Sequence, residues 1–140
     1  MLYLDTSLLV AAFVQELKTA VVQPWLEART DKELAISDWV ITEFSAALSI
    51  KTRVGQLRSD LRLNALTTFA RSCAESFVIL SVSRPQFRIA AQLADQSALG
   101  VRAGDALHLA LSIENGATLC TLDRRLSEAA TALGVATELL

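Results

Sequence analysis

Hydrophobic and polar positions follow one another in blocks that predict short buried strands separated by amphipathic helices. The first apolar run, Leu2–Leu4, ends abruptly at Asp5-Thr6-Ser7, and a helical pattern starts directly afterwards. A short apolar run beside a helical pattern is typical of a central strand in a parallel sheet. Such a strand places Asp5 at its carboxyl end, which is the edge where open α/β sheets bind ligands.

The same block pattern continues to the end of the chain without repeats or a linker. The other expected strands are Leu34–Ile36, Phe77–Val82, Thr118–Thr121 and Val135–Leu139. The expected helices are Thr6–Val14, Leu17–Ala28, Trp39 to a stop at Gly55, Leu61–Ser76, Pro85–Leu99, Ala103–Asn115 and Arg124–Leu133. Strands that alternate with helices predict a single α/β domain over residues 1–140 with a parallel sheet.

Turn and cap residues refine the expected boundaries. Pro24 predicts a kink or a break near Gln23, because proline removes a helical hydrogen bond and crowds the preceding turn. A polar turn is expected over residues 30–33, starting at Thr30. Ser59 or Asp60 is expected to cap the helix that follows.

Composition excludes several classes of protein. With 52% hydrophobic and 20% charged residues, the chain is not expected to be disordered. Aromatic residues make up only 6%, which argues against a single-strand binder built on stacked bases. No apolar run is long enough to span a membrane, and no secretory signal pattern opens the chain. We therefore expect a cytoplasmic protein without membrane contact, in which Cys73 and Cys120 are buried free thiols.

Charge is unevenly distributed in a chain whose net charge is −2. The segment from Lys51 to Arg71 holds five basic residues and one acid, a net charge of +4. Such a segment could bind phosphate or an acidic partner, or could simply be a solvated helix face. The apolar surplus, together with Trp25 and Trp39, suggests that a partner covers part of the surface.

Four acidic residues stand at positions where a site could form. Asp5 and Asp123 end two strands of the predicted parallel sheet, so both should lie at the same edge. Glu43 lies at the rim of an apolar helical stripe, from which its side chain can reach a cleft. Asp105 begins a helix that is apolar almost all round, and His108 stands one turn later.

Each of these acids also has an ordinary structural explanation. Asp5, Thr6 or Ser7 could cap the next helix, Asp105 could stabilise a helix start, and Glu43 could be solvated. His108, the only histidine, could touch Asp105 or could be a satisfied core residue. Taken together, three Asp and one Glu beside the hydroxyls of Thr6, Ser7 and Thr121 form an oxygen-only set, which suits Mg²⁺ or Mn²⁺.

The spacing of these residues resembles that of the PIN domain, and more narrowly of VapC-type toxins from toxin–antitoxin pairs. The matching motifs are Asp5-Thr6-Ser7 after the first strand, Glu43 in ITEF, Asp105 in GDALHLA and Asp123 in TLDRRL. The order and spacing match over the whole chain. One departure is Leu122, where many members of the family carry Asn before the last acid.

The resemblance implies a three-layer α/β/α sandwich with a central parallel sheet of four to five strands. It implies a Mg²⁺- or Mn²⁺-dependent endoribonuclease that acts on RNA, forms homodimers and is inhibited by a cognate antitoxin. The implied catalytic and metal-binding quartet is Asp5, Glu43, Asp105 and Asp123, supported by Thr6, Ser7 and Thr121.

Two other functions remain open at this point. The chain could be an inactive PIN-like module that only binds RNA or protein. It could also use Asp5 as the nucleophile of an aspartyl-phosphate enzyme. Dehalogenase-like enzymes of that kind carry a second acid two residues on, where this chain has Ser7.

Overall fold

A computed structural model describes residues 1–29 and 31–140 of the chain. The described residues form a five-stranded, fully parallel sheet with strand order β3-β2-β1-β4-β5. The strands are β1 (Leu2–Leu4), β2 (Leu34–Ser37), β3 (Val78–Leu80), β4 (Thr118–Thr121) and β5 (Thr137–Leu139). The predicted α/β class and parallel sheet are therefore confirmed.

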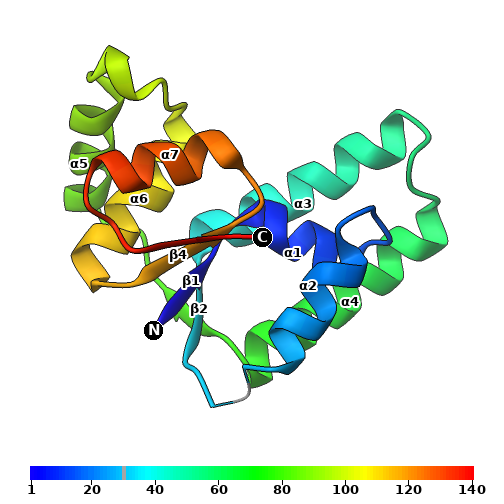
Figure 1. Cartoon of the computed structure of the whole chain (residues 1–140). Helices are drawn as coiled ribbons and strands as arrows, with labels where there is room; N and C mark the ends of the chain where they lie inside the picture. The colour runs from blue at the N-terminus through cyan, green and yellow to red at the C-terminus, as the bar shows by residue number, and fades with distance from the viewer. Residues whose placement is uncertain (30) are drawn as a thin grey trace.

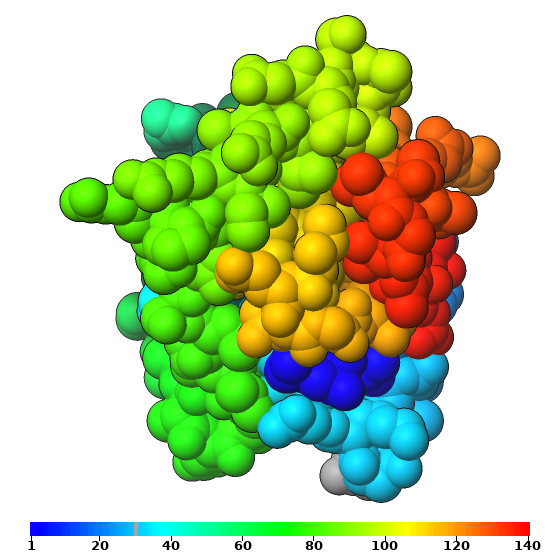
Figure 2. Space-filling model, turned by 90° about the vertical axis from the view of Figure 1, so that its left-hand side faces the viewer, coloured from blue at the N-terminus to red at the C-terminus, as the bar shows by residue number. Residues whose placement is uncertain are grey.

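The helices lie on both sides of this sheet (Figure 1). They are α1 (Thr6–Phe13), α2 (Thr19–Glu27), α3 (Asp38–Arg53), α4 (Ser59–Glu75), α5 (Arg84–Ala94), α6 (Ala103–Asn115) and α7 (Arg124–Ala132), with a 3₁₀ turn at Ser97–Leu99. Helices α1, α2 and α4 lie at one side of the sheet, and α5, α6 and α7 lie at the other (Figure 1). On that second side α6 reaches the surface between α5 and α7 (Figure 2). The arrangement is consistent with the expected three-layer sandwich.

The sheet order reverses direction between β1 and β4. The chain builds outward from β1 through β2 to β3, and then returns to β4 on the other side of β1. In open α/β sheets this switch point opens a crevice outside the carboxyl ends of the two strands. Asp5 follows β1 and Asp123 lies two residues after β4, so the topology brings the two ends together.

The core lies where the helices meet the sheet. Val40, Phe44 and Leu48 are fully buried on α3, as the apolar stripe predicts. Phe44 stacks against Phe69 with ring centroids 4.1 Å apart, and Phe13 meets both rings edge-on. Burying aromatic side chains in such contacts holds α1, α3 and α4 together.

Several expected boundaries differ from the structure. The break near Gln23 is wrong, because α2 runs through Pro24 to Glu27. The cap at Ser59 or Asp60 is also wrong: Arg58 is the N-cap, without a side-chain cap bond, and Asp60 pairs with the Arg58 guanidinium instead.

The fifth helix ends earlier than expected. It stops at Ala94, and the residues before Gly100 form the separate 3₁₀ turn, which Gly100 closes at a φ of 63°. Cys120 is buried as expected, whereas Cys73 is only half-buried. The polar turn was expected to begin at Thr30, which lies outside the described residues. Within the described part of the chain, no helix combines the length and hydropathy needed to cross a bilayer.

Candidate active site at the switch point

Asp5 is the central residue of the candidate site. Its side chain is only 4% exposed, at the carboxyl end of β1. The Ser7 hydroxyl donates to Oδ1 at 2.7 Å, the Thr121 hydroxyl donates to Oδ2 at 2.7 Å, and the Leu8 amide donates to Oδ1 at 3.1 Å. Asp5 therefore caps α1, as the structural alternative proposed, and also joins the ends of β1 and β4.

The environment of Asp5 is unfavourable for its charge. Burial raises the pKa of the Asp5 carboxyl above its ordinary value, although nearby His108 and the hydrogen bonds from Thr121 and Ser7 oppose the shift. No lysine or arginine pairs with Asp5 among the described residues. A buried carboxylate without a cationic partner costs free energy, and a bound cation would remove that cost.

The supporting hydroxyls connect the two strand ends further. Ser7 Oγ accepts the Leu122 amide at 3.0 Å, and Thr121 Oγ1 accepts the Asp123 amide at 2.9 Å. The backbone amide, rather than the side chain of residue 122, thus makes the contact at this position. The replacement of the family's frequent Asn by Leu122 leaves these bonds intact.

Glu43 reaches the same region from α3. Its Oε2 accepts from the Thr6 hydroxyl at 2.6 Å and from His108 Nε2 at 2.9 Å. Burial acts to raise the pKa of Glu43, but the hydrogen bond and electrostatic attraction from His108, followed by the hydrogen bonds from Thr6 and Trp39, outweigh it and hold the pKa below its usual value. Glu43 is therefore ionised at neutral pH. The expected contact between His108 and Asp105 is replaced by this contact with Glu43.

Asp105 and Asp123 each use one oxygen as a helix cap. Asp105 Oδ2 accepts the Arg102 amide at 2.9 Å at the start of α6. Asp123 Oδ1 accepts the amides of Arg125 and Leu126 at 2.8 and 3.3 Å at the start of α7. The second oxygen of each carboxylate makes no hydrogen bond with the described residues.

The quartet is not drawn into a finished metal site. Nowhere in residues 1–29 and 31–140 do three His, Cys, Asp or Glu side chains cluster closely enough to hold a metal ion as they stand. The structure nevertheless links Asp5 to Thr121 and Ser7, and Glu43 to Thr6, through direct hydrogen bonds. The donor set contains only oxygen at the carboxylates, which fits a hard divalent cation.

Sequence reasoning missed Tyr3, Ser37 and Trp39 as neighbours of the site. Tyr3 and Ser37 are fully buried and connect to Glu43 through His108. A tyrosine in the middle of a buried three-residue strand was the available signal, because a buried hydroxyl needs a partner.

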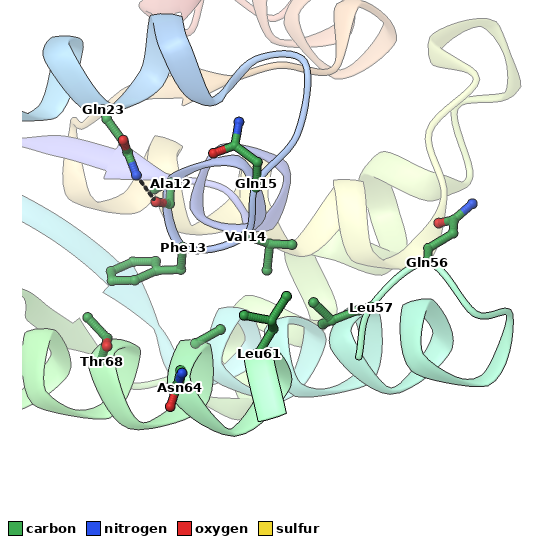
Figure 3. A pocket seen from close by; sticks show the side chains of 11 residues that line it. Ala12, Phe13, Val14, Gln15, Gln23, Gln56, Leu57, Leu61, Asn64 and Thr68 are labelled. Atoms are coloured by element: carbon green, nitrogen blue, oxygen red, sulfur yellow. Dashed lines mark hydrogen bonds between the residues drawn. The ribbon is translucent and has the colours of Figure 1, made fainter. Parts of the chain in front are cut away.

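A separate hollow of about 350 Å³ lies at the other end of α1, between α1 and α4 (Figure 3). The side chains of Val14, Leu57 and Leu61 point toward one another in this hollow. Gln23 lies at its edge and donates to the Ala12 carbonyl at 2.9 Å. No acidic or basic residue lines the hollow, so it differs in character from the switch-point site.

Comparison with known proteins identifies the class of the fold. A model of the PIN domain family matches residues 2–132, and the chain belongs to the PIN domain family. No curated protein matches the chain.

Three solved structures show the same fold. VapBC2 from Rickettsia felis, bound to a DNA fragment from its promoter, is 20% identical with a TM-score of 0.73, covering 100% of this chain and 99% of that one. VapC20 from Mycobacterium tuberculosis, a sarcin–ricin loop cleaving toxin, is 17% identical with a TM-score of 0.74, covering 92% and 95%. FitAcB from Neisseria gonorrhoeae is 18% identical with a TM-score of 0.69, covering 98% and 96%.

Proposed function

We propose that this chain is a divalent-metal-dependent endoribonuclease and the toxin of a toxin–antitoxin pair. The observation that carries the proposal is Asp5, a buried carboxylate at the switch point of the sheet that hydroxyls orient and no described lysine or arginine pairs with. Family membership over residues 2–132 supports a nuclease. The toxin–antitoxin structures with the same fold support the biological role.

In the proposed site, Asp5 and Asp105 are the direct ligands of Mg²⁺ or Mn²⁺. Glu43 and Asp123 bind through water or orient the attacking water. A divalent cation in such a site activates water and stabilises the leaving oxygen of a phosphodiester. Ser7 and Thr121 keep the Asp5 carboxylate in one orientation, and Thr6 does the same for Glu43.

Glu43 is suited to take the proton of the attacking water. Its carboxylate is ionised, and Oε2 is held by Thr6 and His108, while Oε1 lies beside Gly104 and the Trp39 indole. As the water oxygen bonds to phosphorus, its proton would pass to this carboxylate, and the leaving nucleotide oxygen, once its bond to phosphorus breaks, would take a proton from solvent.

The test is cleavage of RNA by the purified protein with and without Mg²⁺. Asp5→Asn and Asp105→Asn should each abolish Mg²⁺-dependent cleavage while the fold survives. Asp95→Asn is the matched control, because Asp95 is exposed at the end of α5. This variant should cleave RNA like wild type. Cleavage by Asp5→Asn at the wild-type rate would contradict the proposal, and RNA binding without cleavage by wild type would favour the inactive-module alternative.

The proposed protein partners are a cognate antitoxin and a second copy of the chain. An apolar hollow of about 250 Å³ beside Trp39, Phe87 and Leu107 lies on the side that carries α5 and α6, and Phe87 is 51% exposed. We assign this face to the homodimer, because burying exposed aromatic surface favours association. Sedimentation should show a dimer that Phe87→Glu dissociates, whereas a wild-type monomer throughout the micromolar range would refute it.

A further inference from the structure

A row of buried hydrogen bonds runs from the end of β2 to Glu43. Ser37 Oγ lies 2.8 Å from the Tyr3 hydroxyl, which lies 3.0 Å from His108 Nδ1. On the other side of the ring, His108 Nε2 lies 2.9 Å from Glu43 Oε2. Ser37, Tyr3 and His108 are 0%, 0% and 3% exposed, so bulk water does not replace any of these bonds.

The direction of the protons follows from the two ends of the row. Ionised Glu43 can only accept, so His108 Nε2 carries a hydrogen. At the far end, Ser37 Oγ already accepts the Val40 amide at 3.2 Å, and the only other partner described for its hydroxyl is Tyr3. Ser37 therefore donates to Tyr3, and Tyr3 donates to an unprotonated Nδ1.

The other oxygen of Glu43 lies close to Gly104, at the start of α6. A Cβ atom on Gly104 would stand 2.6 Å from Glu43 Oε1 and 3.4 Å from Trp39 Nε1. The buried Trp39 indole N–H lies beside the same carboxylate and helps to hold the pKa of Glu43 down. With Oε2 fixed by His108 and Thr6, Oε1 thus lies beside Gly104 and the Trp39 indole.

We propose that Ser37, Tyr3 and His108 form a positioning relay, which fixes Glu43 Oε2 and through it the orientation of the whole carboxylate. This inference rests on the proposed nuclease function and deepens it. None of the three residues touches the substrate. They act through Glu43. Burying three polar side chains costs free energy unless each is hydrogen-bonded, and the relay supplies these bonds.

The first test is spectroscopic and does not need activity. His108 is the only histidine of the chain, so ¹⁵N NMR of the imidazole reports this residue alone. The wild-type spectrum should show the tautomer protonated at Nε2 with Nδ1 unprotonated. Tyr3→Phe, which keeps the ring and removes the hydroxyl, should shift the Nδ1 signal because its hydrogen bond is lost. Protonation at Nδ1 in wild type, or an unchanged spectrum in Tyr3→Phe, would overturn the relay.

The second test is kinetic. Tyr3→Phe and His108→Leu should lower kcat by about 10- to 100-fold, the usual loss when an orienting partner is removed, with KM changed less than about twofold. His108→Gln offers both an amide donor and a carbonyl acceptor and should recover most of the loss. Ser112→Ala is the matched control: Ser112 is buried on the same helix but donates to the His108 carbonyl, outside the relay.

The two tests separate the relay from the nuclease. If wild type does not cleave RNA, the proposed function fails, and the spectra of wild type and Tyr3→Phe still decide the relay. If wild type cleaves and both Tyr3→Phe and His108→Leu keep its kcat, the relay is wrong and the nuclease stands. A loss of kcat that His108→Gln does not recover, or that Ser112→Ala shares, would show that His108 only packs in the core. Either result would also overturn the relay.

Discussion

Replacing Asp5 by Asn separates a metal-binding carboxylate from a helix cap. In a metal-free protein the Asp5 charge is buried and its pKa is raised by that burial, so the charge opposes folding. Asn keeps a carbonyl oxygen to accept from Leu8 and Ser7, and its amide can donate to Thr121 if that hydroxyl turns. The cap survives and the charge is gone, so Tm in chelator should rise.

The response to Mg²⁺ should run in the opposite direction. At a metal concentration of about 100 times Kd, binding stabilises the native state by about 2.7 kcal/mol. For a domain of this length, that corresponds to a rise in Tm of roughly 5 to 15 °C. Wild type should show this rise and Asp5→Asn should not, because the variant has lost a proposed ligand.

The pH dependence of stability is a further check on whether the Asp5 charge opposes folding. Since the pKa of Asp5 is raised in the folded protein, wild type loses stability as pH rises from the unfolded pKa through the folded one. The advantage of Asp5→Asn in chelator should therefore be full at neutral pH and shrink on acidification through that window. Thermal melts in chelator and in Mg²⁺ measure all three effects. A variant destabilised by the roughly 0.5–2 kcal/mol of a lost cap, beside a wild type indifferent to Mg²⁺, would refute the reasoning.

Three further predictions concern the rest of the molecule. Phe44→Ala should lower the free energy of unfolding by about 3–5 kcal/mol in denaturant titrations, because Phe44 is fully buried against two other rings; a loss below about 1 kcal/mol would contradict this packing. Cys73 should react with a thiol reagent in the folded protein and Cys120 should not, since burial raises the pKa of Cys120 to about 12; equal rates would be inconsistent. Replacing Arg53 and Arg58 by Gln should reduce the salt dependence of RNA binding by about one to two phosphate contacts, and an unchanged slope would leave the basic segment a solvated face.

The fold was predictable because short apolar runs and helical stripes alternate so regularly. The stripe of Val40, Phe44 and Leu48 is buried as its spacing requires, and the glycine stops at Gly55 and Gly116 have positive φ. The prediction from Pro24 was wrong because α2 continues to Glu27 in spite of the hydrogen bond that the proline removes. The prediction that Asp60 caps α4 was wrong because its exposed carboxylate pairs with the Arg58 guanidinium instead.

The edge of the sheet at which the candidate site lies was predictable from the sequence, but the contacts within the site were not. Strand order places Asp5 and Asp123 at one end of the sheet, and this follows from a parallel topology alone. The partner of His108 does not follow from helical spacing, because it depends on how α6 packs against α3 and β1. Asp105 and Asp123 act as helix caps in the structure. The same carboxylate can therefore cap a helix and still be a proposed metal ligand.

The bond between Asp5 and Thr121 joins residues 116 positions apart, and this has a consequence for synthesis. A chain leaves the ribosome from its N-terminus, and domains fold as units once their partners have emerged. Asp5 is synthesised well before Thr121, whose hydroxyl orients it, because the two residues are 116 positions apart. A prematurely terminated product that lacks β4 cannot assemble the switch point at all. The site of the proposed nuclease therefore stays unformed until β4 has been synthesised and can pair with β1.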